Sequence, residues 1–136
     1  MSTQNQNGYM LLFRGTELRK SLSPEEMQKV SEKWMAWFRR LTEQGKAVAG
    51  NPLEREGKIV SGKDRIVSDG PFAESKEAIG GYLVLDVETL EEAIAIARTN
   101  PALAYGTSIE IRPLTEECPL DTWARESALQ EQLANA

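Results

Sequence analysis

The sequence predicts an α+β fold in which two helices cover one face of an antiparallel sheet. The elements follow one another as strand, helix, strand, hairpin, strand, helix and strand. Two of these strands, 8–14 and 80–87, are apolar on both faces, which is typical of strands in the middle of a sheet. A chain of 136 residues, 40% of them hydrophobic, suits a single domain with a real core.

The first third of the chain is predicted to form a strand and a long helix. Residues 8–14, GYMLLFR, are apolar at odd and even positions, so both faces of this strand are expected to be buried. Ser23 and Glu26 form a capping box at a helix start, and Gly45 is a natural helix stop. The helix 24–44 carries an apolar stripe at helical spacing: Met27, Val30, Trp34, Trp37, Phe38 and Leu41. We interpret its aromatic residues as core, with a ligand cage as the alternative.

The remaining elements are predicted from turn residues and short apolar runs. They are a strand at 46–50, a hairpin at 58–70 with its bend at 61–64, a strand at 80–87, a helix capped by Thr89 and ending before Pro101, a strand at 107–113 and a short helix at 120–133. In the strand 107–113, Ile109 and Ile111 alternate with polar residues, which favours a position at the sheet edge.

This order of elements is a split βαβ pair with an inserted hairpin, the ferredoxin-like arrangement. Its two central strands would be the two that are apolar on both faces. Because two helices cover one face only, the other face needs a cover, and a second copy of the chain is the simplest one. We therefore expect a homodimer through 9–14 and 80–87. The expected domain is 8–114, followed by a helical tail at 115–136.

Composition excludes several classes of function. The net charge of −5 argues against a nucleic-acid backbone as the partner. There is no histidine and a single cysteine, Cys118, so histidine-based triads and zinc sites built from His or Cys are excluded. We expect no metal and no cofactor. No apolar run approaches the roughly 20 residues that span a membrane, and the polar start differs from a secretory signal, so the expected location is the cytoplasm.

The run SDGPFAESKEAIGGYLVLD, residues 68–86, resembles the signature of the DGPF branch of the YCII-related family. The segments YMLLFR, LSPEEMQ, GKAVAGNPL and YGTSIEIRPL agree with the same family pattern, so the resemblance covers residues 8–114. It implies a dimeric α+β barrel of ferredoxin-like subunits and an active-site role for Asp69. Some relatives pair this Asp with a His, which the present chain lacks. The resemblance also implies an association with alternative sigma factors in transcription initiation.

Asp69 has two interpretations. Before Gly70 and Pro71 its carboxylate suits a turn, where it accepts hydrogen bonds from nearby backbone N–H groups. Alternatively, Asp69 ends a strand at the mouth of a pocket and acts there as a general acid or base. The candidate substrate-binding residues around it are Arg14, Gly70, Pro71, Phe72, Lys76 and Tyr82. Arg14 would hold an anionic substrate through its guanidinium.

Two classes of function stay open on these grounds. The first is a protein that binds a small organic molecule near Asp69, with an anionic ligand as one version and cofactor-free catalysis by that residue as its enzymatic form. The second is a non-catalytic regulatory module that acts with an alternative sigma factor. The absence of histidine favours binding over catalysis, while the polar residues gathered around Asp69 favour a site of some kind.

Overall fold

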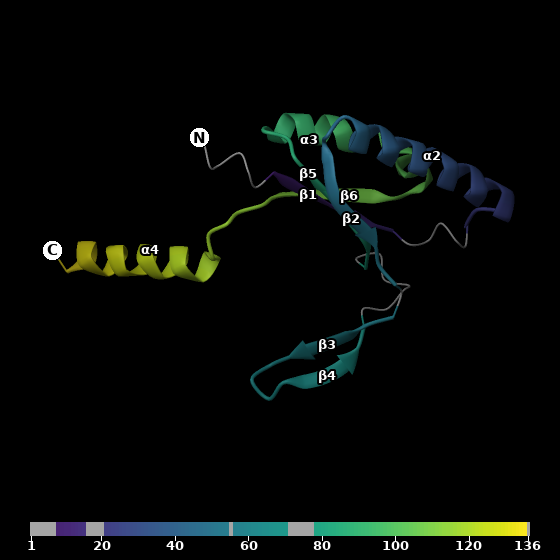
Figure 1. Ribbon diagram of the computed structural model, residues 1–136. Helices are drawn as coiled ribbons and strands as arrows, with labels where there is room; N and C mark the ends of the chain where they lie inside the picture. The colour runs from purple at the N-terminus through teal and green to yellow at the C-terminus, as the bar shows by residue number, and fades with distance from the viewer. Residues whose placement is uncertain (1–7, 16–20, 55, 71–77, 136) are drawn as a thin grey trace.

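The computed structural model describes residues 8–15, 21–54, 56–70 and 78–135 of the chain (Figure 1). Its main sheet is antiparallel, with the strand order β2-β5-β1-β6. The four strands are β1 (Tyr9–Arg14), β2 (Ala47–Pro52), β5 (Ile79–Leu85) and β6 (Ser108–Pro113). This order confirms the ferredoxin-like arrangement, with the two strands that are apolar on both faces in the middle and β6 at an edge.

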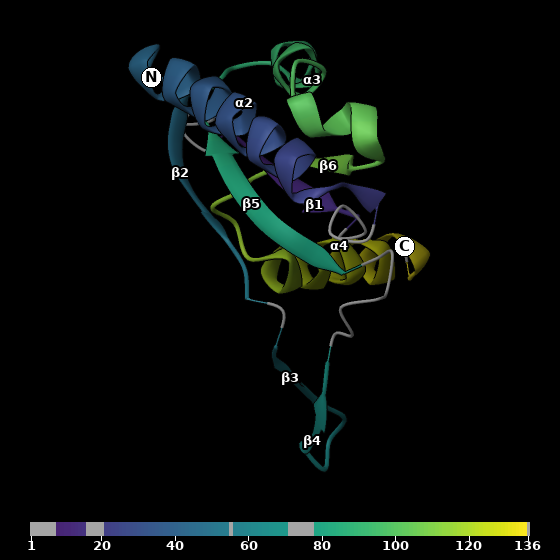
Figure 2. The same ribbon diagram turned by 90° about the vertical axis from the view of Figure 1, so that its right-hand side faces the viewer.

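Two helices cover one face of this sheet, α2 (Pro24–Glu43) and α3 (Leu90–Ala97), as Figure 2 shows. Both begin at the predicted caps. The Ser23 hydroxyl accepts from the backbone N–H of Glu26, whose carboxylate accepts from the backbone N–H of Ser23. The Thr89 hydroxyl accepts from the backbone N–H of Glu92. A short 3-10 helix, η2 (Pro101–Tyr105), leads from α3 into β6.

The core lies between these helices and the sheet. Leu11 of β1 and Leu85 of β5 are fully buried, and Trp37 of α2 packs with them. The indole N–H of Trp37 donates to the Thr99 hydroxyl over 2.7 Å, so its polar atom is satisfied inside the core. The interpretation of Trp37 as a core residue is therefore confirmed.

The opposite face of the sheet is apolar at its centre. Side chains alternate along a strand, so the neighbours of Leu11 and Leu83 point away from the helices. Cross-strand pairs on this open face are Leu12 with Tyr82 and Met10 with Val84, and all four are partly buried. The chain's own helices α2 and α3 do not cover them.

Two elements extend from this body on the side opposite α2 and α3 (Figures 1 and 2). The first, which we call the arm, is the predicted hairpin: β3 (Lys58–Ser61) pairs with β4 (Ile66–Asp69) as a separate two-stranded sheet. The second is α4 (Pro119–Ala134), the predicted helical tail. Whether the domain boundary falls at residue 114 stays a prediction.

Candidate ligand-binding site

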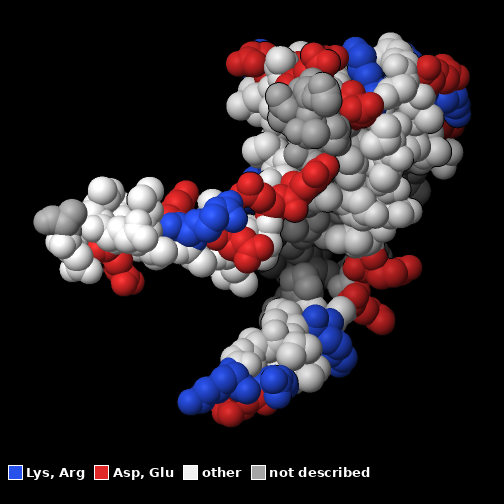
Figure 3. Space-filling model, turned by 60° about the vertical axis from the view of Figure 1, so that its left-hand side comes forward, with Lys and Arg blue, Asp and Glu red and all other residues white. Residues whose placement is uncertain are grey.

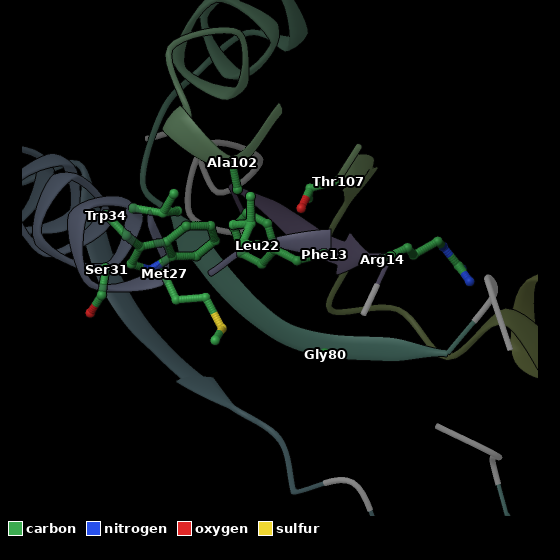
Figure 4. A pocket seen from close by; sticks show the side chains of 11 residues that line it. Phe13, Arg14, Leu22, Met27, Ser31, Trp34, Gly80, Ala102 and Thr107 are labelled. Carbon is green, nitrogen blue, oxygen red and sulfur yellow. The ribbon is translucent and has the colours of Figure 1, made fainter. Parts of the chain in front are cut away.

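A cavity lies where the N-terminal half of α2 crosses the ends of β1 and β5. It has a volume of about 330 Å³, and most of the side chains around it are apolar. Those that form its apolar wall are Phe13, Leu22, Met27, Val30, Trp34 and Ala102. Ser31, Thr107 and Arg14 are the polar residues at its margin, as Figure 4 shows. We call this space the first chamber.

A second chamber, of about 410 Å³, lies between α2 and the strands β2 and β5. Its walls include Met35, Phe38, Asn51, Pro52, Tyr82 and Leu83. The two chambers share Phe13, Trp34 and Gly80, so they adjoin at these residues. Together they form one region of unfilled space along the underside of α2.

Aromatic side chains shape the junction between the chambers. The ring of Trp34 meets that of Phe13 edge-on, with centroids 4.9 Å apart, and lies 5.6 Å from the ring of Trp37. Edge-on contact is one of the geometries that aromatic pairs prefer. Trp34, Trp37 and Phe38 all line the second chamber, and Trp37 is also a buried member of the core, against which Trp34 and Phe38 pack. The helical spacing showed that this face is apolar, but not that unfilled space lies against it.

Arg14 links the cavity margin to the open face of the sheet. Its guanidinium donates to Glu110 over 2.6 Å, and Arg112 donates to the other oxygen of that carboxylate over 3.1 Å. These hydrogen bonds hold the pKa of Glu110 below its ordinary value, and the bond from Arg14 has the larger effect. In Figure 4 the Arg14 side chain runs away from Trp34, so its charge lies at the edge of the first chamber.

Tyr82 is half-buried and lines the second chamber. The side-chain amide of Asn51 lies 3.5 Å from the Tyr82 hydroxyl, at the long limit of a hydrogen bond. Tyr82 alternates along β5 with buried Leu83, so its hydroxyl and the paired Asn51 amide lie on the open face of the sheet rather than beneath α2.

Asp69 lies elsewhere, at the base of the arm. Its carboxylate forms an ion pair with Lys58, its cross-strand partner, and its side chain is 76% exposed. Gly70 is buried and donates its backbone N–H to Gly57 over 3.1 Å. Neither residue is among those that line the two chambers. Lys58 is thus the partner of Asp69 within the described residues, and because the residues from 71 to 77 lie outside them, the turn interpretation stays a prediction.

Of the predicted site residues, the structure brings Arg14 and Tyr82 to the margins of adjoining chambers. Pro71, Phe72 and Lys76 lie outside the described residues. Sequence reasoning missed Phe13, Met27 and Asn51 as cavity residues. Phe13 and Met27 read as ordinary core positions, because periodicity shows which face is buried and not whether packing there is complete.

The described residues contain no group of three or more His, Cys, Asp or Glu side chains placed to hold a metal ion. No helix within the described ranges has both the length and the apolar composition needed to cross a membrane.

Comparisons with known proteins agree with the architecture. Residues 8–117 match the YCII-related domain. An uncharacterized protein of Rhizobium meliloti (strain 1021) is 32% identical over 116 residues, which cover 77% of the present chain and 89% of that relative. The finer assignment to the DGPF branch stays a prediction. With the ferredoxin-like sheet and a family match across most of its length, the chain belongs to the YCII-related domain family.

Proposed function

We propose that the protein binds a small, largely apolar organic molecule in the two adjoining chambers beneath α2. One observation carries this proposal: about 330 and 410 Å³ of unfilled space lies against aromatic side chains at the edge of the core. Ligand sites typically enclose about 300–1,000 Å³ and combine apolar walls with a few polar groups.

The polar end of this ligand is proposed to lie toward Arg14. Arg14 lines the first chamber and forms, with Glu110 and Arg112, a group with one negative and two positive charges. The net positive charge favours an anionic end, such as a carboxylate. If Arg14 turns to the ligand, Glu110 still accepts a hydrogen bond from Arg112, so the Glu110 carboxylate keeps a positively charged partner.

A library of small aromatic and alicyclic carboxylic acids tests this proposal, each acid paired with its primary amide. Binding is measured by ligand-observed NMR and by the quenching of tryptophan fluorescence. We expect Ser31→Phe to lower affinity at least tenfold, because the new ring occupies the first chamber. Gln28→Phe is the matched control, since Gln28 is exposed on the same helix and outside the lining residues.

Failure of every compound to bind would remove the ligand proposal and favour the regulatory module. Equal binding to the two variants would place the ligand outside the first chamber. Acids that bind no better than their amides would remove the anionic requirement while leaving the apolar ligand in place.

Catalysis by Asp69 without a cofactor is a second proposal. Gly80, which lines both chambers, follows Asp69 by eleven residues in the sequence, and the resemblance noted above supports a role for this Asp. In this proposal the carboxylate takes up or returns a proton of the bound molecule. Such a reaction requires Asp69 to exchange Lys58 for the ligand.

We also propose that the chain is a homodimer joined through its open sheet face. Met10, Leu12, Tyr82 and Val84 form an apolar patch there that α2 and α3 leave uncovered. Apolar faces of this kind are usual at interfaces between protein chains. A second copy would present the same patch and complete a two-layered barrel.

A further inference from the structure

The arm exposes apolar side chains that its own strands do not bury. Val60 is 65% exposed and Ile66 is 62% exposed, and Ile59 and Val67 are also open to solvent. In the part of the chain that the structure describes, β3 and β4 pair with each other as a sheet of their own. A lone hairpin of two short strands is marginally stable in water, so packing against another surface would stabilise the arm.

The tail helix α4 also exposes apolar side chains. It has no buried residue, and Leu120 and Trp123 are 69% and 59% exposed. Leu129 and Leu133 are exposed on another side of the helix. An exposed tryptophan together with three exposed leucines on one short helix is typical of a contact surface.

The charges of these two elements are opposite. On the arm, Lys58, Lys63 and Arg65 outnumber Asp64 and Asp69, and Figure 3 shows the arm's basic side chains standing clear of the body. The segment that contains α4 is strongly acidic, with a single basic residue, Arg125. Its acidic residues are Glu116, Glu117, Asp121, Glu126 and Glu131.

The arm and α4 of one chain lie apart from each other in both ribbon views (Figures 1 and 2). A second copy of the chain supplies each with the element that it lacks. In a two-fold dimer, the arm of one copy can meet α4 of the other, and the same contact then occurs twice. Opposite charge and exposed apolar surface are both matched in this arrangement.

We propose that the arm of each protomer packs against α4 of a second copy of the chain. The partner helix covers the apolar side chains of the arm, and the arm's basic tip faces the acidic residues of α4. This contact goes beyond the proposed joining of the open sheet faces, because it links the two copies through the arm and α4, which lie outside the main sheet. It is also independent of any ligand in the chambers.

Native Cys118, exposed at the start of α4, allows a direct test. We expect Lys63→Cys, placed at the arm's bend, to form a covalent dimer with the partner's Cys118 when a short bifunctional maleimide is added. Lys33→Cys, exposed on α2, is the matched control and should give little covalent dimer. Adding Cys118→Ser to Lys63→Cys should remove the product, which distinguishes arm-to-α4 linkage from arm-to-arm linkage.

Charge reversal tests the same contact without chemical linkage. Lys63→Glu with Arg65→Glu should weaken dimerisation about tenfold, because two exposed ion pairs are lost. Glu126→Lys with Glu131→Lys in the same chain should restore the affinity, as measured by sedimentation equilibrium at low salt. Restoration in the combined variant supports the proposal. A failure to restore dimerisation overturns it.

The two proposals about assembly fail in different ways. A dimer in which Lys63→Cys is linked no faster than Lys33→Cys would overturn the arm contact and leave the joining of sheet faces intact. A linked product that persists after Cys118→Ser would place arm against arm and also overturn the proposal. A protein that is monomeric at micromolar concentration would overturn both.

Discussion

The body of the molecule and its arm use similar residues in opposite ways. Leu11 and Leu85 lie in strands and are fully buried, whereas Val60 and Ile66, also in strands, are more than half exposed. Both regions have the apolar residues that favour strands. The body adds α2 and α3 above its sheet, while the arm has no second layer in the described chain. Strand formation and burial are therefore separate outcomes, and burial depends on how many elements share one core.

The largest expected effect is on the core. Trp37→Ala removes a buried ring and its hydrogen bond to Thr99, so we expect a loss of roughly 3–5 kcal/mol in the free energy of unfolding. Val67→Ala on the arm, as the contrasting variant, should change it by less than about 0.5 kcal/mol in the monomer. Urea unfolding followed by circular dichroism measures both. Similar losses would show that the arm belongs to the core.

The next effect concerns the open face of the sheet. Leu12→Glu places a charge in the centre of the apolar patch, so we expect the dimer to dissociate at micromolar concentration. Leu53→Glu is the control, because Leu53 is already exposed just after β2. Light scattering reports the mass of each variant. A Leu12→Glu protein that remains dimeric would exclude this face as the interface.

The charge at the cavity margin is tested by two arginines that share one carboxylate. Arg14→Ala should weaken the binding of a carboxylic acid about tenfold, whereas Arg112→Ala should leave it nearly unchanged, since only Arg14 lines the first chamber. Isothermal titration calorimetry with an acid and its amide measures the difference. Equal losses in the two variants would point to a general effect of positive charge rather than to contact with Arg14.

A smaller effect on stability is expected at Asp69. Its pair with Lys58 is exposed, so Asp69→Asn and Asp69→Ala should each lower stability by less than about 1 kcal/mol. If Asp69 is the acid or base of a reaction, Asp69→Asn should keep the fold and ligand binding yet abolish turnover, since an amide does not take up the proton. Retained turnover in Asp69→Asn would remove the residue from the chemistry.

The smallest effect is a dependence of stability on pH. Because Arg14 and Arg112 lower the pKa of Glu110 in the folded protein, this carboxylate stabilises the fold at pH values above its ordinary pKa of 4.5. The contribution should be lost as the pH falls through the lowered pKa. Urea midpoints of the wild type and Glu110→Gln, measured from pH 7 to pH 3, should therefore differ at neutral pH and converge at the acid end. Parallel curves would contradict this account.

Local signals allowed much of the fold to be predicted. The capping box at Ser23 and the cap at Thr89 marked where α2 and α3 begin, and the two-faced apolar pattern of β1 and β5 placed them in the sheet centre. The candidate site was less predictable. Trp34 and Trp37 are three residues apart on one helix face and both line the second chamber, yet only Trp37 is a buried core residue, because their surroundings come from distant strands.

The order of the elements, their caps and the apolar faces of β1 and β5 could be predicted from the chain alone, since these depend on neighbouring residues and short periodicities. The tertiary structure decided where space remains unfilled and which charges meet. Glu110 joins Arg14 across ninety-six residues of chain, and Asp69 finds Lys58 through the pairing register of the arm. Contacts between residues so far apart depend on how whole elements pack, and a linear pattern does not carry that information.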